Sequence, residues 1–211
     1  MDRVFNDRIP SMRKLLLAAL MVTSLMITGC KDAASPGAAA GAKSASSPVS
    51  IAAIAAEATG FTAGSAMSAR TVYVFFDAQC AHCSDLWRNA KPLKSQAKFV
   101  WIPVGLLNAA STAQGATLLA SKDAVALMDE HEASMLAKRG GISGGSDIDA
   151  QKEAVAKNTQ LLNRFGFASI PTIIGTHAET GALVTKEGAL STAALASLLG
   201  LQPPAGPGPA R

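Results

Sequence analysis

Two cysteines spaced as C-x-x-C, Cys80 and Cys83, constrain this chain more than any other feature. They follow the run from Thr71 to Phe76, whose β-branched and aromatic residues are typical of a buried strand. Helix-forming sequence comes next and extends to about Gln96, with Pro92 expected to break or kink it. The cysteine pair is therefore predicted to lie where a strand passes into a helix.

The rest of the chain continues as alternating strand and helix signals. A second strand is expected over 98–103, two helices over 112–138 with a break near Asp123, and a helix over 149–165 that Gly166 ends. Pro171 opens a strand over 171–174, which is expected to pair with 182–185 before a closing helix over 192–199. This order predicts an α/β domain, and a C-x-x-C at its first strand–helix junction favours a thioredoxin-like fold with a helical insertion.

The spacing of the two cysteines also predicts their chemistry. On the first turn of a helix, free backbone N–H groups and the helix dipole stabilise a thiolate at Cys80. That thiolate can attack a substrate disulfide, and Cys83 can then attack Cys80 and release the substrate. A purely structural disulfide is disfavoured because so short a loop constrains the unfolded chain very little. We expect no metal and no cofactor, because a zinc site would need two further ligands at suitable spacing.

The three histidines receive different interpretations. His82 lies between the cysteines, where its ring could stabilise the Cys80 thiolate, although a solvent-exposed filler is the alternative. His131 stands between Glu130 and Glu132 and is expected to be an ordinary surface residue. His177 follows a predicted strand and is expected in a loop.

The N-terminal sequence predicts export. Arg13 and Lys14 precede a short apolar run that ends in Ile27-Thr28-Gly29-Cys30, a pattern that resembles the lipobox of bacterial lipoproteins. Residues 1–29 are thus expected to be a signal peptide, and Cys30 is expected to carry the lipid. The sequence does not decide whether translation begins at Met1 or at Met12. An ordinary signal peptide or an uncleaved anchor is the alternative. We expect a periplasmic, lipid-anchored protein, with Lys31 favouring the outer membrane over the inner.

Composition then sets the expected boundaries. Residues 30–50, rich in Ala, Ser, Gly and Pro, are expected to be a flexible tether, and 202–211 a disordered tail. Residues 51–70 are expected to be a short lead-in to a catalytic domain over 71–201. The formal net charge of +4 is spread along the chain without a basic, aromatic-interleaved run, so nucleic acid is not an expected partner.

Several motifs together resemble the catalytic domain of the periplasmic DsbC/DsbG disulfide isomerases, the DsbG proteins most. The matching residues are Phe75-Phe76-Asp77-Ala78-Gln79-Cys80-Ala81-His82-Cys83, Trp87, Trp101-Ile102-Pro103-Val104-Gly105, Asn158, Leu161, Leu162, Gly166 and Pro171. The resemblance implies Cys80 as nucleophile, Cys83 as resolving thiol and Pro171 as a cis-proline that, with Ile170, offers backbone groups to substrate. It also implies exported cysteine-containing proteins as substrates and a DsbD-like membrane reductase as electron donor.

Three differences from that family bear on function. The dipeptide between the cysteines contains His82, as in the oxidase DsbA, and Ile170 replaces the usual threonine before the cis-proline. About forty residues between Cys30 and the first predicted strand are too few for the family's dimerisation domain, so we expect a monomer.

The sequence therefore predicts a periplasmic thiol–disulfide oxidoreductase acting as reductase, isomerase or oxidase. The alternative is a metal-handling or scaffold lipoprotein on the same fold, with Cys80, Cys83 and His82 as soft ligands.

Overall fold

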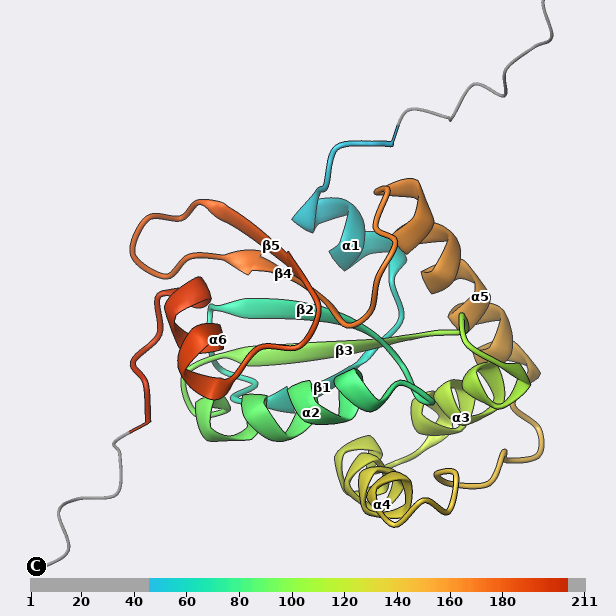
Figure 1. Cartoon of the computed structure of the whole chain (residues 1–211). Helices are drawn as coiled ribbons and strands as arrows, with labels where there is room; N and C mark the ends of the chain where they lie inside the picture. The colour runs from blue at the N-terminus through green and yellow to red at the C-terminus, as the bar shows by residue number, and fades with distance from the viewer. Residues whose placement is uncertain (1–45, 205–211) are drawn as a thin grey trace, which may run out of the picture. The chain divides into compact units, whose positions relative to one another are not determined.

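Five strands form one mixed sheet in the computed structural model, which describes residues 46–204 (Figure 1). The strand order is β1-β3-β2-β4-β5. Their bounds are β1 Phe61–Gly64, β2 Thr71–Asp77, β3 Lys98–Val104, β4 Thr172–Thr176 and β5 Leu183–Glu187. β2 and β3 run parallel, with Phe75 opposite Ile102, and every other neighbouring pair is antiparallel.

Six α-helices accompany the sheet in the described residues. They are α1 Ile51–Glu57, α2 Ala81–Ala90, α3 Ala109–Ala120, α4 Ala124–Leu136, α5 Asp149–Arg164 and α6 Thr192–Leu199, with a 3₁₀ turn at Lys91–Leu93. α2 crosses from the end of β2 back over the sheet to β3, the crossover that two parallel strands require. α3 and α4 lie to one side of the sheet in Figure 1, where they form the predicted helical insertion.

Alternating residues of β2 explain why helices pack on both faces of the sheet. Val72, Val74 and Phe76 join a core that includes residues of α2 and α6. Tyr73 and Phe75 point the other way, into a second core shared with α1 and α5. Because β2 is buried on both faces, it appears in the sequence as a continuous apolar run. The predicted α/β, thioredoxin-like fold is confirmed.

The predicted elements are largely present. α6 has the predicted bounds, and the break between α3 and α4 falls at Ser121–Asp123, where Asp123 caps α4 by accepting a hydrogen bond from the Ala126 N–H. α2 ends at Ala90, before Pro92, and the chain continues as the 3₁₀ turn rather than as helix to Gln96.

The segment before residue 71 is more than a lead-in. β1 is an edge strand of the sheet, with Phe61 opposite Trp101, and Ile54 of α1 is completely buried. Even Ser47, within the expected tether, donates its N–H to the carbonyl of Arg164. The physical reason is that, without residues 47–64, one edge of β3 would be unpaired and an apolar surface of α5 would be exposed.

Other expectations fall outside the described residues. These are the signal peptide over 1–29, the lipidation site Cys30, most of the expected tether and residues 205–211 of the expected tail. Over residues 46–204, no helix has the length and apolar character needed to cross a membrane.

Candidate active site

Cys80 occupies the position that caps the N-terminus of α2. Its N–H donates to the carbonyl of Asp77 at 3.0 Å, which closes a tight turn at the end of β2. Its own carbonyl accepts the N–H groups of Cys83 and Ser84 and so begins the helix. The strand-to-helix junction thereby holds the Cys80 sulfur beside the free N–H groups of the first helical turn.

This environment lowers the pKa of Cys80 from 9.0 to about 7. The largest cause is a hydrogen bond from the Cys83 thiol, and partial burial of Cys80 opposes it. Backbone N–H groups of Cys83 and His82 lower the pKa further, as does the charge of the His82 ring. A substantial fraction of Cys80 is therefore thiolate near neutral pH.

Cys83 is 1% exposed and lies in the first turn of α2, three residues after Cys80. Burial raises its pKa far above the ordinary value, and a thiolate at Cys80 raises it further. Both cysteines are free thiols in this structure. The pair is thus strongly asymmetric: Cys80 is 8% exposed and ionises near neutral pH, whereas Cys83 is enclosed and protonated.

His82 is exposed, and its ring points along the helix surface. Its Nδ1 lies 3.8 Å from Oδ2 of Asp85, which also forms an ion pair with Arg88. Its backbone N–H influences the pKa of Cys80 more than its ring does. The predicted tuning by the ring is therefore the weakest of the effects that favour the Cys80 thiolate.

The loop before β4 faces Cys80. The peptide bond between Ile170 and Pro171 is cis, as the family resemblance implied. The carbonyl oxygen of Ile170 lies 3.8 Å from the Cys80 sulfur, although the two residues are 90 positions apart in the chain. The fold thus brings together Cys80, Cys83 and the Ile170–Pro171 pair; binding of substrate by that pair stays a prediction.

Asp77 is a buried carboxylate that the sequence reasoning missed as a site residue. It is 1% exposed, and its Oδ1 accepts the N–H of Gln79. Its Oδ2 accepts the N–H groups of Leu106 and Leu107 at 2.7 and 3.0 Å. Asp77 therefore fixes the turn before Cys80 to the loop after β3. An acidic residue directly after an apolar strand and three positions before the cysteine was the available signal.

The expectation for His131 was wrong. Its side chain is completely buried, and its Nε2 lies 2.7 Å from the carbonyl oxygen of Ala78, two residues before Cys80. Glutamates on either side suggested a polar surface, but neighbours along a helix point in different directions, and only Glu130 is exposed. His177 lies in the loop after β4, as predicted.

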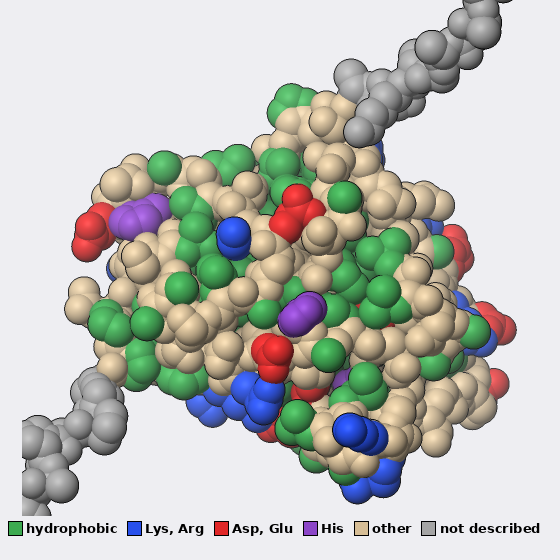
Figure 2. Space-filling view, in the orientation of Figure 1, with side chains coloured by type: hydrophobic (Ala, Val, Ile, Leu, Met, Phe, Trp, Pro, Cys, Tyr) green, Lys and Arg blue, Asp and Glu red, His purple; other side chains and the backbone are tan. Residues whose placement is uncertain are grey.

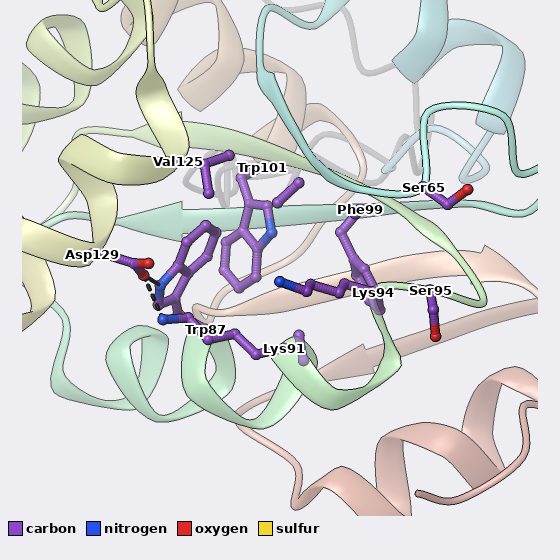
Figure 3. Close-up of a pocket in the computed structure, with 12 residues that line it drawn as sticks. Ser65, Trp87, Lys91, Lys94, Ser95, Phe99, Trp101, Val125 and Asp129 are labelled. Atoms are coloured by element: carbon purple, nitrogen blue, oxygen red, sulfur yellow. Dashed lines mark hydrogen bonds and ion pairs between the residues drawn. The ribbon is translucent and has the colours of Figure 1, made fainter.

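The described part of the chain contains no cluster of three or more His, Cys, Asp or Glu side chains suited to a metal ion. A pocket of about 540 Å³ lies instead beside the C-terminal half of α2 and is lined by residues of β1, β3 and α4 as well. Figure 3 shows Asp129 bonded to both the Trp87 indole and Lys91 at this pocket, which neither cysteine lines. Lys and Arg side chains gather over α2 and α4 on the face seen in Figure 2.

Comparison with known proteins identifies sequence relatives. The thiol:disulfide interchange protein DsbG of Pseudomonas aeruginosa is 33% identical over 140 residues, which are 65% of this chain and 54% of that protein. DsbG of Escherichia coli is 29% identical over 104 residues, 48% of this chain and 42% of that protein. The chain thus spans about half the length of these curated relatives. No family model matches it.

Solved structures support the fold. The catalytic domain of Proteus mirabilis ScsC is 15% identical, with a TM-score of 0.53 over 71% of this chain and 96% of that one. Pseudomonas aeruginosa DsbA2 is 18% identical, with a TM-score of 0.55 over 65% and 91%. A periplasmic thioredoxin-like protein from Salmonella enterica has a TM-score of 0.56 at 15% identity, over 73% and 97%. Over one thioredoxin-like domain, then, this chain is similar in sequence to the DsbG thiol:disulfide interchange proteins and similar in fold to these solved structures.

Proposed function

We propose that this chain catalyses thiol–disulfide exchange with cysteine-containing proteins through Cys80 and Cys83. The observation that carries the proposal is the asymmetry of the pair. Cys80 has its pKa lowered to about 7 at the start of α2, whereas burial keeps Cys83 protonated behind it. Similarity to DsbG proteins over the same domain supports this activity.

The reaction follows from that asymmetry. The Cys80 thiolate attacks one sulfur of a substrate disulfide, whose S–S bond breaks as the second substrate sulfur leaves and takes up a proton. Cys83 then loses its proton and attacks the Cys80 sulfur, so that the mixed disulfide breaks and the first substrate sulfur leaves. The substrate disulfide gains two electrons, and the Cys80–Cys83 pair loses two. The reverse sequence oxidises a substrate dithiol.

Ile170 and Pro171 are proposed to bind the substrate chain. The Ile170 carbonyl lies beside the Cys80 sulfur, so a backbone N–H of an extended substrate could bond to it while the substrate sulfur approaches Cys80. Backbone recognition of this kind tolerates many side chains, which suits an enzyme that acts on varied proteins.

Exchange of the nucleophile tests the activity. Cys80→Ser should abolish dithiol-dependent reduction of insulin, and Cys83→Ser should accumulate a mixed disulfide on Cys80. Unchanged insulin reduction by Cys80→Ser would contradict the proposal. The equilibrium with glutathione would then separate the roles, because a strongly oxidising pair favours oxidase or isomerase activity and a reducing pair favours reductase activity.

We further propose that the protein is exported to the periplasm, anchored by a lipid on Cys30, monomeric, and reduced by a DsbD-like membrane protein. The lipobox-like sequence before Cys30 supports export and the anchor, and the similarity to DsbG proteins supports the periplasm and a membrane reductase. The monomer is proposed because only about forty residues separate Cys30 from β2. Cys30→Ser should release the protein from the membrane fraction and abolish labelling by a fatty acid. Labelling that survives this substitution would exclude the anchor.

A further inference from the structure

Behind the turn that leads to Cys80, the helical insertion forms a hydrogen-bonded network that includes the buried His131. One ring nitrogen, Nε2, lies 2.7 Å from the carbonyl oxygen of Ala78, and the other, Nδ1, lies 3.2 Å from the backbone nitrogen of Ile142. A carbonyl only accepts and a backbone N–H only donates, so Nε2 carries the proton and the ring is neutral. Burial lowers the pKa of His131, which maintains this form.

The loop over 140–142 closes tightly on the ring. A Cβ at Gly141, whose φ is +89°, would lie only 2.4 Å from Cε1 of His131. Ser134 donates to the Gly141 carbonyl, and Gln114 donates to the carbonyls of Gly140 and Ile142. The imidazole is therefore held in one orientation from the side opposite the cysteines.

The same network reaches the residue directly before Cys80. Nε2 of Gln79 donates to Oε1 of Gln114 at 2.6 Å and to the Gly140 carbonyl at 3.0 Å. Ala78 and Gln79 are thus both tied to the insertion, Ala78 through His131 and Gln79 through Gln114. The bond from His131 to Ala78 is buried and the bond from Gln79 to Gln114 is half-buried, so water competes weakly for these two ties, whereas the Gly140 carbonyl is exposed.

We propose that His131 is a positioning residue that sets the acidity of Cys80 by fixing the carbonyl of Ala78. The Cys80 thiolate is stabilised by the Cys83 thiol and by N–H groups of the first turn of α2, and each of those bonds depends on where the turn over 77–80 places the sulfur. Loss of the bond to Ala78 lets this turn move, which weakens them. This inference rests on the proposed use of Cys80 as nucleophile and adds a role for the insertion.

Two substitutions separate the two bonds of the ring. In His131→Gln, the side-chain amide reaches the position of Nε2 and can still donate to Ala78. In His131→Asn, the shorter amide reaches only the position of Nδ1, where it can accept the Ile142 N–H but cannot bond to Ala78. Each variant loses one hydrogen bond of the ring, so both should be less stable than the unchanged protein.

The readout is the pH profile of iodoacetamide alkylation of Cys80 in the reduced protein. His131→Asn should raise the midpoint by about half to one pH unit, which lowers the thiolate fraction near pH 6 by about threefold to tenfold. His131→Gln should keep the midpoint near that of the unchanged protein. Ser134→Ala, which loosens the loop without touching Ala78, is the matched control and should also leave it unchanged.

Equal shifts in the Asn and Gln variants, or none in either, would overturn the proposal. Should the variants fail to fold, the unchanged protein still tests it by nuclear magnetic resonance of the imidazole nitrogens. The ring signals of His131 should shift with the same midpoint as the titration of Cys80, and signals that ignore that titration would refute the coupling. Alkylation and resonance need no protein substrate, so this outcome is independent of whether insulin is reduced.

Discussion

At the scale of single residues, the chemistry depends on two sulfurs with opposite environments. Cys80 is stabilised as a thiolate by the Cys83 thiol and by N–H groups of α2, whereas Cys83 is enclosed. Because the Cys83 thiol is the strongest of these stabilising groups, the proposed resolving residue also lowers the pKa of the proposed nucleophile.

Removing the Cys83 thiol should therefore weaken Cys80 as an acid. In Cys83→Ala, we expect the midpoint of Cys80 alkylation to rise from about 7 toward 9. In Cys83→Ser, the hydroxyl can still donate, so the midpoint should rise less. The pH profile of alkylation, measured for both variants and for the unchanged protein, checks this; midpoints equal to that of the unchanged protein would show that the Cys83 side chain plays no part.

The lowered pKa of Cys80 also predicts how stability depends on pH. The folded reduced protein releases the Cys80 proton near pH 7 and the unfolded chain near pH 9, so the contribution of Cys80 is fully present above pH 9 and is lost as pH falls through 7. Cys83 has the opposite effect: because folding raises its pKa, it lowers stability at pH values above the pKa of its thiol in the unfolded chain. Urea titrations of the reduced proteins measure the free energy of unfolding. The value for the unchanged protein should rise relative to that for Cys80→Ala as the pH increases from about 6 to about 8.5. A difference independent of pH would contradict the lowered pKa.

At the scale of elements, α4 connects the insertion to the helix that carries the cysteines. Asp129 of α4 accepts a hydrogen bond from Nε1 of Trp87 at 2.7 Å and pairs with Lys91 at 2.5 Å. Trp87 is 2% exposed, whereas the Lys91 side chain is 45% exposed. Both bonds end on Oδ1 of Asp129, whose side chain is 45% exposed, so they differ in the burial of the donor and not of the acceptor.

The half-buried bond from the Trp87 indole should contribute more to stability than the exposed pair with Lys91. Trp87→Phe keeps most of the aromatic packing but loses the indole N–H, and it should lower the free energy of unfolding by about 1–3 kcal/mol. Lys91→Met should cost less than about 1 kcal/mol because the pair is exposed to water. Urea titrations followed by circular dichroism compare the two, and a larger loss for Lys91→Met would contradict this assignment.

At the scale of the whole molecule, the domain begins before the first predicted strand. Asn158 of α5 donates to the carbonyls of Thr59 and Pro103 and accepts the N–H of Thr59, which ties the α1–β1 connection to β3. Ile54 fills the core beneath α5. These long-range contacts make residues 51–64 part of the domain that contains the cysteines.

Shortening the chain from its N-terminus tests this boundary. A protein that begins at residue 46 should unfold cooperatively and keep the alkylation profile of Cys80. One that begins at residue 71 exposes the β3 edge and leaves the place of Ile54 empty, a loss of at least about 2–5 kcal/mol. Calorimetry of the two proteins measures the difference; equal melting temperatures would restore the boundary at residue 71.

Much of the fold was predictable because its signals are local. The continuous apolar run of β2, the capping of α4 by Asp123 and the helix end at Gly166, whose φ is +79°, each depend on a few adjacent residues. β1 was not predictable in this way, because a four-residue strand is stabilised by its partner and not by its own composition. The same limit explains His131, whose charged neighbours give no sign of the direction in which its ring points.

The sequence by itself determined the C-x-x-C pair, its place at a strand–helix junction and the thioredoxin-like order of elements, since spacing and periodicity encode all three. Only the tertiary structure decided which distant groups meet that pair. The Ile170 carbonyl, the Asp77 bonds to the loop after β3 and the bond from His131 to Ala78 arise from residues 29 to 90 positions apart. Such contacts depend on how sheet, helices and insertion pack together, and packing is a property of the folded chain rather than of any segment of it.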